Sequence, residues 1–158
     1  MQSIFRRETE NFSERKGRLV IILSVDYGRV RTGVAVCDKN EVIASPVEVI
    51  KETRQEVLAG RIAELCEKTS AEQIVLGLPR NMDGSEGESA QNVRAFREIL
   101  TEKTGLEVVL RDERCTTVTA HGYLNDTNTR GKKRKAVVDS VAAVIILEDY
   151  LRYRRNSL

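Results

Sequence analysis

The sequence has no tryptophan, a single histidine and three cysteines, and aromatic residues make up 4% of its 158 residues. So few aromatic side chains argue against a stacking platform for single-stranded nucleic acid. The cysteines are odd in number and widely spaced, which excludes a full disulfide framework. We interpret them as small core residues in a reducing compartment. One histidine and scattered cysteines also make a zinc site a poor interpretation.

A dominant charge and long apolar runs are missing too. Lys and Arg number 26 against 24 Asp and Glu, a formal net charge of +2. Any affinity for nucleic acid must therefore come from a local basic patch. No stretch reaches the roughly 18 apolar residues of a membrane span, and residues 1–18 lack the apolar middle of a secretory signal. We expect a cytoplasmic protein without membrane contact.

The length fits one domain that can bury its own core. We expect residues 1–18 to form a flexible N-terminal extension, residues 19–153 a single folded domain, and residues 154–158 a C-terminal tail. Apolar runs bounded by turn residues predict strands at 19–25, 31–37, 41–50, 73–77 and 106–110. Helical spacing predicts helices at 54–68, 90–103, 116–124 and 136–153. This order, with a meander followed by alternating strands and helices, indicates an α/β fold with a mixed five-stranded sheet.

Three carboxylates stand at boundaries of buried elements. Asp26 follows the most apolar strand, Glu113 lies at the end of another strand, and Asp139 sits in the first turn of an apolar helix. Each has an ordinary interpretation alone, as a turn residue, a surface residue and a helix N-terminal charge. Taken together they favour a site, because ligands bind at the carboxyl ends of parallel strands.

If the three carboxylates converge, they form an all-oxygen ligand set. Such a set suits Mg²⁺ or Mn²⁺ rather than zinc. Two such ions about 4 Å apart can activate water and stabilise the leaving oxygen of a phosphodiester. The sequence therefore raises the hypothesis of a metal-dependent nuclease.

Two further features accompany the acids. A basic segment leads into the helix that carries Asp139, and it is either a solvated loop or a set of phosphate contacts beside the site; it contains Arg130, Lys132, Lys133, Arg134 and Lys135. A glycine turn follows Asp26, where Gly28 allows a tight turn and Gly33 allows close approach of a substrate. A similar hairpin binds phosphate in actin-like ATPases, but that fold needs two such domains.

Four segments carry a family resemblance. They are VDYGRVRTGVAV from Val25, IVLGLPRNMDGSEG from Ile74, DERCTT from Asp112 and VDSVAAVIILEDYL from Val138. In this order they make the chain resemble the YqgF family of RuvC-like Holliday junction resolvases, which are also described as pre-16S rRNA nucleases. The resemblance covers nearly everything from residue 19 to residue 151. Cys115 and Arg111 depart from the usual pattern, and neither belongs to the acidic set.

The resemblance implies an RNase H-like fold, with helices on both faces of the sheet, and metal-dependent phosphodiester cleavage. By motif, Asp26, Glu113 and Asp139 are its catalytic, metal-binding acids, and the family's basic loop corresponds to residues 130–135. It favours maturation of the 5′ end of pre-16S rRNA, with cleavage of branched DNA and non-catalytic binding of nucleic acid as alternatives. A stable homodimer would fit a junction resolvase, and a monomer would fit rRNA processing.

Overall fold

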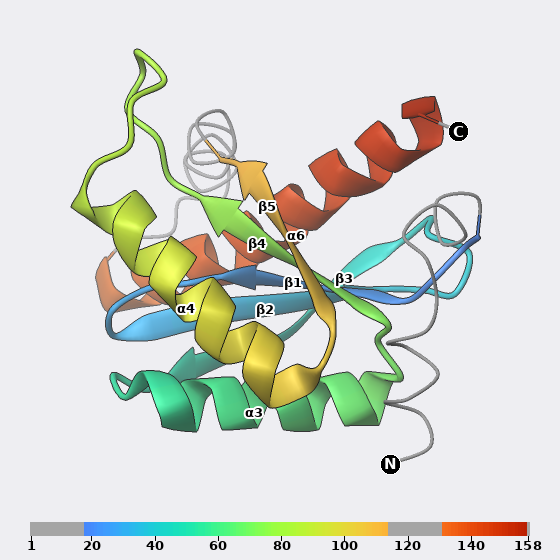
Figure 1. The fold of residues 1–158 in the computed structure, drawn as a ribbon, viewed down its shortest axis with the longest axis horizontal. Helices are drawn as coiled ribbons and strands as arrows, with labels where there is room; N and C mark the ends of the chain where they lie inside the picture. Colours follow the sequence, from blue (N-terminus) through green and yellow to red (C-terminus); the bar gives the residue numbers. More distant parts are fainter. Residues whose placement is uncertain (1–17, 114–130, 158) are drawn as a thin grey trace.

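The structure is a computed structural model that describes residues 18–113 and 131–157, with side chains in the second segment from Val141 onward. Its five strands form one sheet in the order β3-β2-β1-β4-β5 (Figure 1). The strands are β1 Ile22–Asp26, β2 Arg31–Cys37, β3 Ala44–Lys51, β4 Gln73–Leu78 and β5 Glu107–Asp112. β1, β2 and β3 form an antiparallel meander, and β4 and β5 run parallel to β1. The expected α/β fold with a mixed sheet is confirmed.

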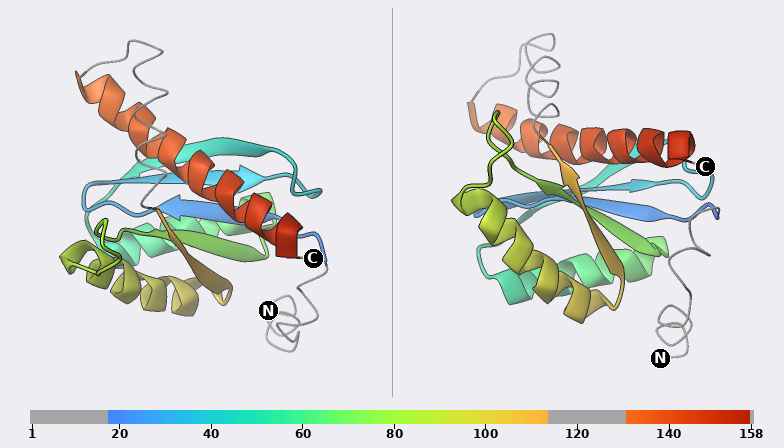
Figure 2. Two further views of the ribbon diagram at one scale, coloured as in Figure 1. Left: turned by 90° about the horizontal axis from the view of Figure 1, so that it is seen from above. Right: turned by 45° about the horizontal axis from the view of Figure 1, so that its top comes forward.

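Helices cover both faces of this sheet (Figure 2). They are α3 Gln55–Thr69, α4 Glu88–Thr104 and α6 Gly131–Ser157. α3 and α4 lie on one face, and the long α6 crosses the other face diagonally. The helix expected at 116–124 falls outside the described residues. Within the part of the chain that is described, no helix is both long and apolar enough to cross a membrane.

The alternation of side chains along the strands divides the core into two layers. Leu23 and Val25 of β1 pack with α3 and α4, whereas Ile22 packs with α6. This period of two is the ordinary geometry of a strand buried on both faces. Val57 of α3 is 45% exposed although it is apolar. It lies about 100° around the helix from Leu58, on the side away from the other apolar positions.

The last helix differs most from the sequence-based expectation. It begins at Gly131 and ends at Ser157, not at residues 136 and 153. Residues 132–135, expected in a loop, are therefore helical, as the high helix propensity of Lys and Arg allows. At the other end, the side chain of Arg154 is 11% exposed and its Nε lies 2.6 Å from Oε1 of Glu41. This ion pair holds the end of α6 against the turn between β2 and β3.

Candidate active site

Asp26 is the last residue of β1 and faces α6. The two residues before it on the same face of the strand are Ile22, which packs with α6, and Ser24, whose hydroxyl donates a 2.7 Å hydrogen bond to the carbonyl oxygen of Ala143. Strand alternation then places Asp26 on this face at the carboxyl end of the sheet. Asp26 is half-buried, so the residue is neither enclosed in the core nor fully exposed to solvent.

Glu113 reaches the same place from β5. Its N–H donates a 3.2 Å hydrogen bond to the carbonyl oxygen of Leu78, which continues the pairing of β4 with β5 for one more residue. The carboxyl groups of Glu113 and Asp26 lie close enough to interact directly. Two of the three acids expected to converge therefore lie together at one end of the sheet.

Gly77 makes this convergence possible, and it was not among the residues predicted for the site. It lies on β4, between β1 and β5, opposite Arg111. A Cβ added at Gly77 would lie 2.6 Å from Oε2 of Glu113 and 2.7 Å from Cδ1 of Ile146. Any side chain at residue 77 would thus occupy the space that Glu113 and α6 fill. A glycine inside an otherwise apolar strand is the available signal, because such a glycine often marks a close approach.

The electrostatics of the pair follow from its burial. Removal of the Glu113 carboxyl from water raises its pKa above the usual 4.5. The interaction with the Asp26 side chain opposes this rise, and the negative charge of Asp112 adds to it. Two carboxylates this close repel each other unless a proton or a cation lies between them. A divalent cation suits the same position, because it neutralises both oxygens without a proton.

Asp139 belongs to α6, one helical turn before Ala143. Ala143 accepts the hydrogen bond from Ser24, and Ser24 is two residues before Asp26 on the strand. One turn of helix advances about 5.4 Å and two strand residues about 6.6 Å, so the backbone of Asp139 comes to the level of Asp26. The side chain of Asp139 lies outside the described part. Among the side chains that are described, no three His, Cys, Asp or Glu residues form a group able to hold a metal ion.

The two glycines of the turn have different surroundings. A Cβ on Gly28 would lie 2.1 Å from the carbonyl oxygen of Arg31, so the tight turn excludes a side chain there. The turn is fixed by Tyr27, whose ring stacks on Phe96 at 4.5 Å. Gly33 pairs directly with Asp26 across β1 and β2, so no side chain stands beside this carboxylate on the β2 side.

The basic segment is placed in part. Residues 132–135 form the start of α6, in the two turns that precede Asp139. Arg130 lies outside the described residues, as do His121 and Cys115. The position of the helical part agrees with a role beside the acids, and its side-chain contacts stay a prediction.

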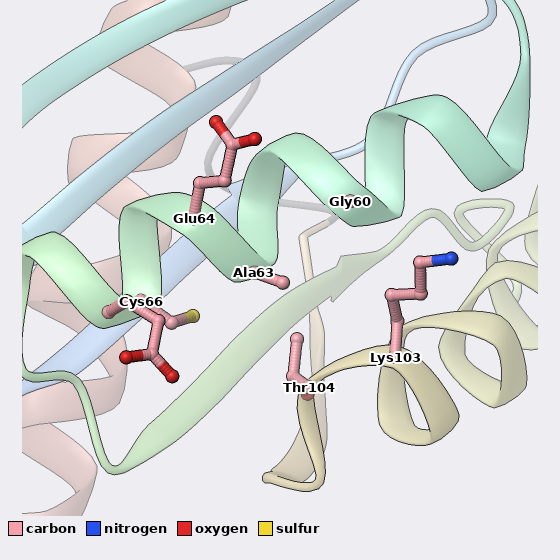
Figure 3. Close-up of a pocket in the computed structure, with 7 residues that line it drawn as sticks. Gly60, Ala63, Glu64, Cys66, Lys103 and Thr104 are labelled. Atoms are coloured by element: carbon pink, nitrogen blue, oxygen red, sulfur yellow. The ribbon is translucent and has the colours of Figure 1, made fainter.

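A shallow pocket of about 220 Å³ lies elsewhere, between α3 and α4 (Figure 3). Its lining includes Gly60, Glu64, Cys66, Lys103 and Thr104. It lies on the face of the sheet opposite to α6, away from Asp26 and Glu113. We therefore assign it no part in the chemistry of the acidic site.

Comparisons with known proteins fit this arrangement. A "Putative pre-16S rRNA nuclease" of Agathobacter rectalis is 40% identical over 139 residues, which cover 86% of this chain and 97% of that protein. A protein of the same name from Ruegeria sp. is 37% identical, covering 94% of this chain and 96% of that protein. The solved structure "T. thermophilus RuvC in complex with Holliday junction substrate" superposes with a TM-score of 0.56 at 14% identity, over 87% of this chain and 97% of that one, and supports the RNase H-like fold. Residues 20–153 match the model of the RuvX family, described as Holliday junction resolvase, and the chain belongs to this family.

Proposed function

We propose that this protein is a metal-dependent endonuclease that hydrolyses phosphodiester bonds at the carboxyl end of β1, and that it processes the 5′ end of pre-16S rRNA. The observation that carries the proposal is the close approach of the carboxyl groups of Asp26 and Glu113. Asp26 ends β1 and Glu113 directly follows β5. Between these strands, at Gly77 of β4, an added side chain would overlap Glu113. Even partial burial of paired carboxyl groups costs free energy, so a fold that only needed stability would not retain them.

Asp139 would complete the site. Its position on α6, one turn before the contact of Ala143 with Ser24, brings a third acid to the level of Asp26. We propose that Asp26, Glu113 and Asp139 hold Mg²⁺ or Mn²⁺, because hard divalent cations prefer oxygen ligands. When bound as a pair, such ions activate a water molecule and stabilise the leaving oxygen. The three acids then position the metal and need no nucleophilic side chain.

The substrate follows from the relatives. The two relatives compared above carry the pre-16S rRNA name and align over nearly their whole lengths, which favours RNA processing and a cytoplasmic location. The family description favours cleavage of branched DNA instead, and we keep a Holliday junction resolvase as the second candidate. A non-catalytic nucleic-acid-binding module is disfavoured, because a cluster of acids would repel phosphates unless cations were bound between them.

A cleavage assay decides between these functions. The purified chain would be incubated with Mg²⁺ or Mn²⁺ and either a pre-16S 5′-leader RNA or a synthetic four-way DNA junction. We expect cleavage of the leader RNA and its loss in Asp26→Asn, with sedimentation showing whether the active species is a monomer or a homodimer. Preferential, paired cuts in the junction by a dimer would establish the resolvase. Binding without cleavage of either substrate would contradict the proposed nuclease.

A further inference from the structure

Two basic residues face each other at the end of the hairpin formed by β2 and β3. Arg31 and Lys51 are direct partners in the antiparallel register. The N–H of Glu52 donates a 3.0 Å hydrogen bond to the carbonyl oxygen of Val30, so the flanking pair is the hydrogen-bonded one. Arg31 and Lys51 therefore occupy a non-hydrogen-bonded position, where opposite Cα atoms approach to about 4.5 Å and the side chains come closest.

Like charges at such a position destabilise a sheet, and no described side chain forms an ion pair with either residue. The two acids nearest to Lys51 along the chain are engaged elsewhere. Glu52 accepts hydrogen bonds from Arg54 at 3.0 and 3.1 Å, and Glu48 accepts a 2.7 Å hydrogen bond from Arg61. Neither Arg31 nor Lys51 forms an ion pair or hydrogen bond with any side chain that the structure describes. The half-buried Arg31 and the exposed Lys51 are thus left without a described ion-pair partner.

Arg31 and Lys51 lie next to the acidic site. Strand alternation puts Arg31 on the same face of β2 as Gly33, and Gly33 is the direct partner of Asp26. Arg31 is two residues beyond Gly33, about 6.6 Å farther along the strand, and Lys51 stands on the next strand, about 4.8 Å away. The two cations therefore border the acidic site on its β2–β3 side without contacting the carboxylates that would hold metal.

We propose that Arg31 and Lys51 form a phosphate-binding subsite for the nucleic-acid backbone, next to the phosphate that is cleaved. The proposal rests on the proposed nuclease function for the identity of the substrate. Arg31 can donate two parallel hydrogen bonds to one phosphate, and Lys51 adds a point charge. An anion bound there cancels the repulsion between the two cations, so binding and the local stability of the hairpin are linked. Both residues are positioning residues, since neither reaches the reacting atoms.

The double variant Arg31→Gln/Lys51→Gln tests the subsite. Its matched control is Lys39→Gln/Lys68→Gln, which removes the same charge from exposed positions in the β2–β3 turn and at the end of α3. Binding of a labelled RNA duplex and a four-way junction would be titrated against salt, in Ca²⁺. We expect the slope of log affinity against log salt to become shallower by about 1–2 in the test variant, because up to two phosphate contacts are lost, and to stay unchanged in the control. The melting temperature of the test variant should not fall.

A second measurement separates this proposal from the proposed function. In an NMR titration with inorganic phosphate, the side-chain N–H signal of Arg31 and the backbone amide of Lys51 should shift saturably in the parent, and Lys51→Gln should weaken the effect at Arg31. If the parent cleaves nucleic acid but test and control variants share its salt slope, the subsite is wrong and the nuclease stands. If the parent neither binds nor cleaves nucleic acid, the nuclease is wrong, and the subsite stands only if phosphate shifts these signals.

Discussion

The carboxylate of Glu113 lies in the space that a side chain at Gly77 would fill, with Oε2 2.6 Å from the position of an added Cβ. This relationship joins three neighbouring strands in one site: β1 supplies Asp26, β4 supplies the vacant position, and Glu113 follows the end of β5. Ile146 of α6 closes the same space from above, at 2.7 Å. The site therefore depends on a residue that has no chemical group of its own.

Gly77→Ala should damage both stability and metal binding. The added methyl group overlaps Glu113 and Ile146, and Ile146 is buried and has little room to move. Overpacking of this kind costs about 1–3 kcal/mol of unfolding free energy. Displacement of Glu113 should also weaken Mn²⁺ binding and cleavage, as measured by calorimetry and by a nuclease assay.

Gly60→Ala is the matched control for this prediction. Gly60 lies inside α3, and an added Cβ would meet only Cε of Lys103, at 3.9 Å. Alanine there should raise the unfolding free energy by about 0.5–1 kcal/mol, because it is a better helix former than glycine. Wild-type metal affinity in Gly77→Ala would show that Glu113 does not need the vacant space.

Glu113→Gln should stabilise the metal-free protein at neutral pH. Burial raises the pKa of Glu113 above 4.5, and a group with a raised folded-state pKa stabilises the fold below its unfolded pKa and loses that contribution as the pH rises through the folded value. The ionised carboxyl therefore disfavours folding at pH 7. We expect a higher melting temperature for the variant at pH 7 and no difference from the parent near pH 4.

The control for this pH dependence is Glu98→Gln on the exposed side of α4, which should leave the melting temperature unchanged throughout. Added Mn²⁺ should reverse the order at neutral pH, because an ion that binds the folded parent raises its apparent stability and the variant offers one charge fewer. A melting temperature of Glu113→Gln below that of the parent at pH 7 would contradict the assigned cause of the pKa shift.

The sequence predicted the fold class and the order of the described elements, because strand and helix periodicities are local signals. It also predicted the meeting of Asp26 and Glu113, since parallel strands carry their carboxyl ends to one edge. It did not predict the role of Gly77. That role depends on a tertiary contact, because the side chain of Glu113 lies against Gly77 only in the folded sheet. The pairing of Arg31 with Lys51 was equally hidden, because the register of β2 with β3 shifts between Val34 and Ala35.

Asp139→Asn should abolish cleavage while leaving the fold intact. Asparagine keeps the shape of the side chain and removes the charge proposed to hold metal. Loss of repulsion among acids could only favour the metal-free fold, so the melting temperature should equal or exceed that of the parent. Turnover would be measured at saturating Mn²⁺. A variant that keeps wild-type turnover there would remove Asp139 from the proposed catalytic set.

The start of α6 should contribute to binding of nucleic acid without reading its sequence. Replacement of residues 132–135 by glutamine removes four positive charges that lie about one to two helical turns before Asp139. Affinity for different duplexes should fall alike, because phosphate contacts carry no sequence information. The salt slope should become shallower by at most about 0.9 for each lost duplex contact, while Mn²⁺ binding persists. An unchanged slope would redirect the search to Arg152 and Arg155, at the far end of the same helix.

The C-terminal end of α6 should contribute to the stability of the fold and not to cleavage. Glu41 is buried and accepts hydrogen bonds from Arg154 at 2.6 and 3.0 Å and from the N–H of Val20 at 3.0 Å. Arg154→Leu leaves this carboxylate buried with one backbone donor, and loss of one partner of a buried ion pair costs about 3–5 kcal/mol.

Denaturant unfolding of Arg154→Leu should show this loss, and the exposed neighbour Arg155→Leu should not. Adding Glu41→Gln to Arg154→Leu should restore part of the stability, because the unpaired buried charge is then removed. Cleavage well below the melting temperature should be equal in all four proteins, since the ion pair lies at the opposite end of β1 from Asp26. Equal stability of Arg154→Leu and Arg155→Leu would instead mean that residues 154–158 behave as the tail that the sequence predicted.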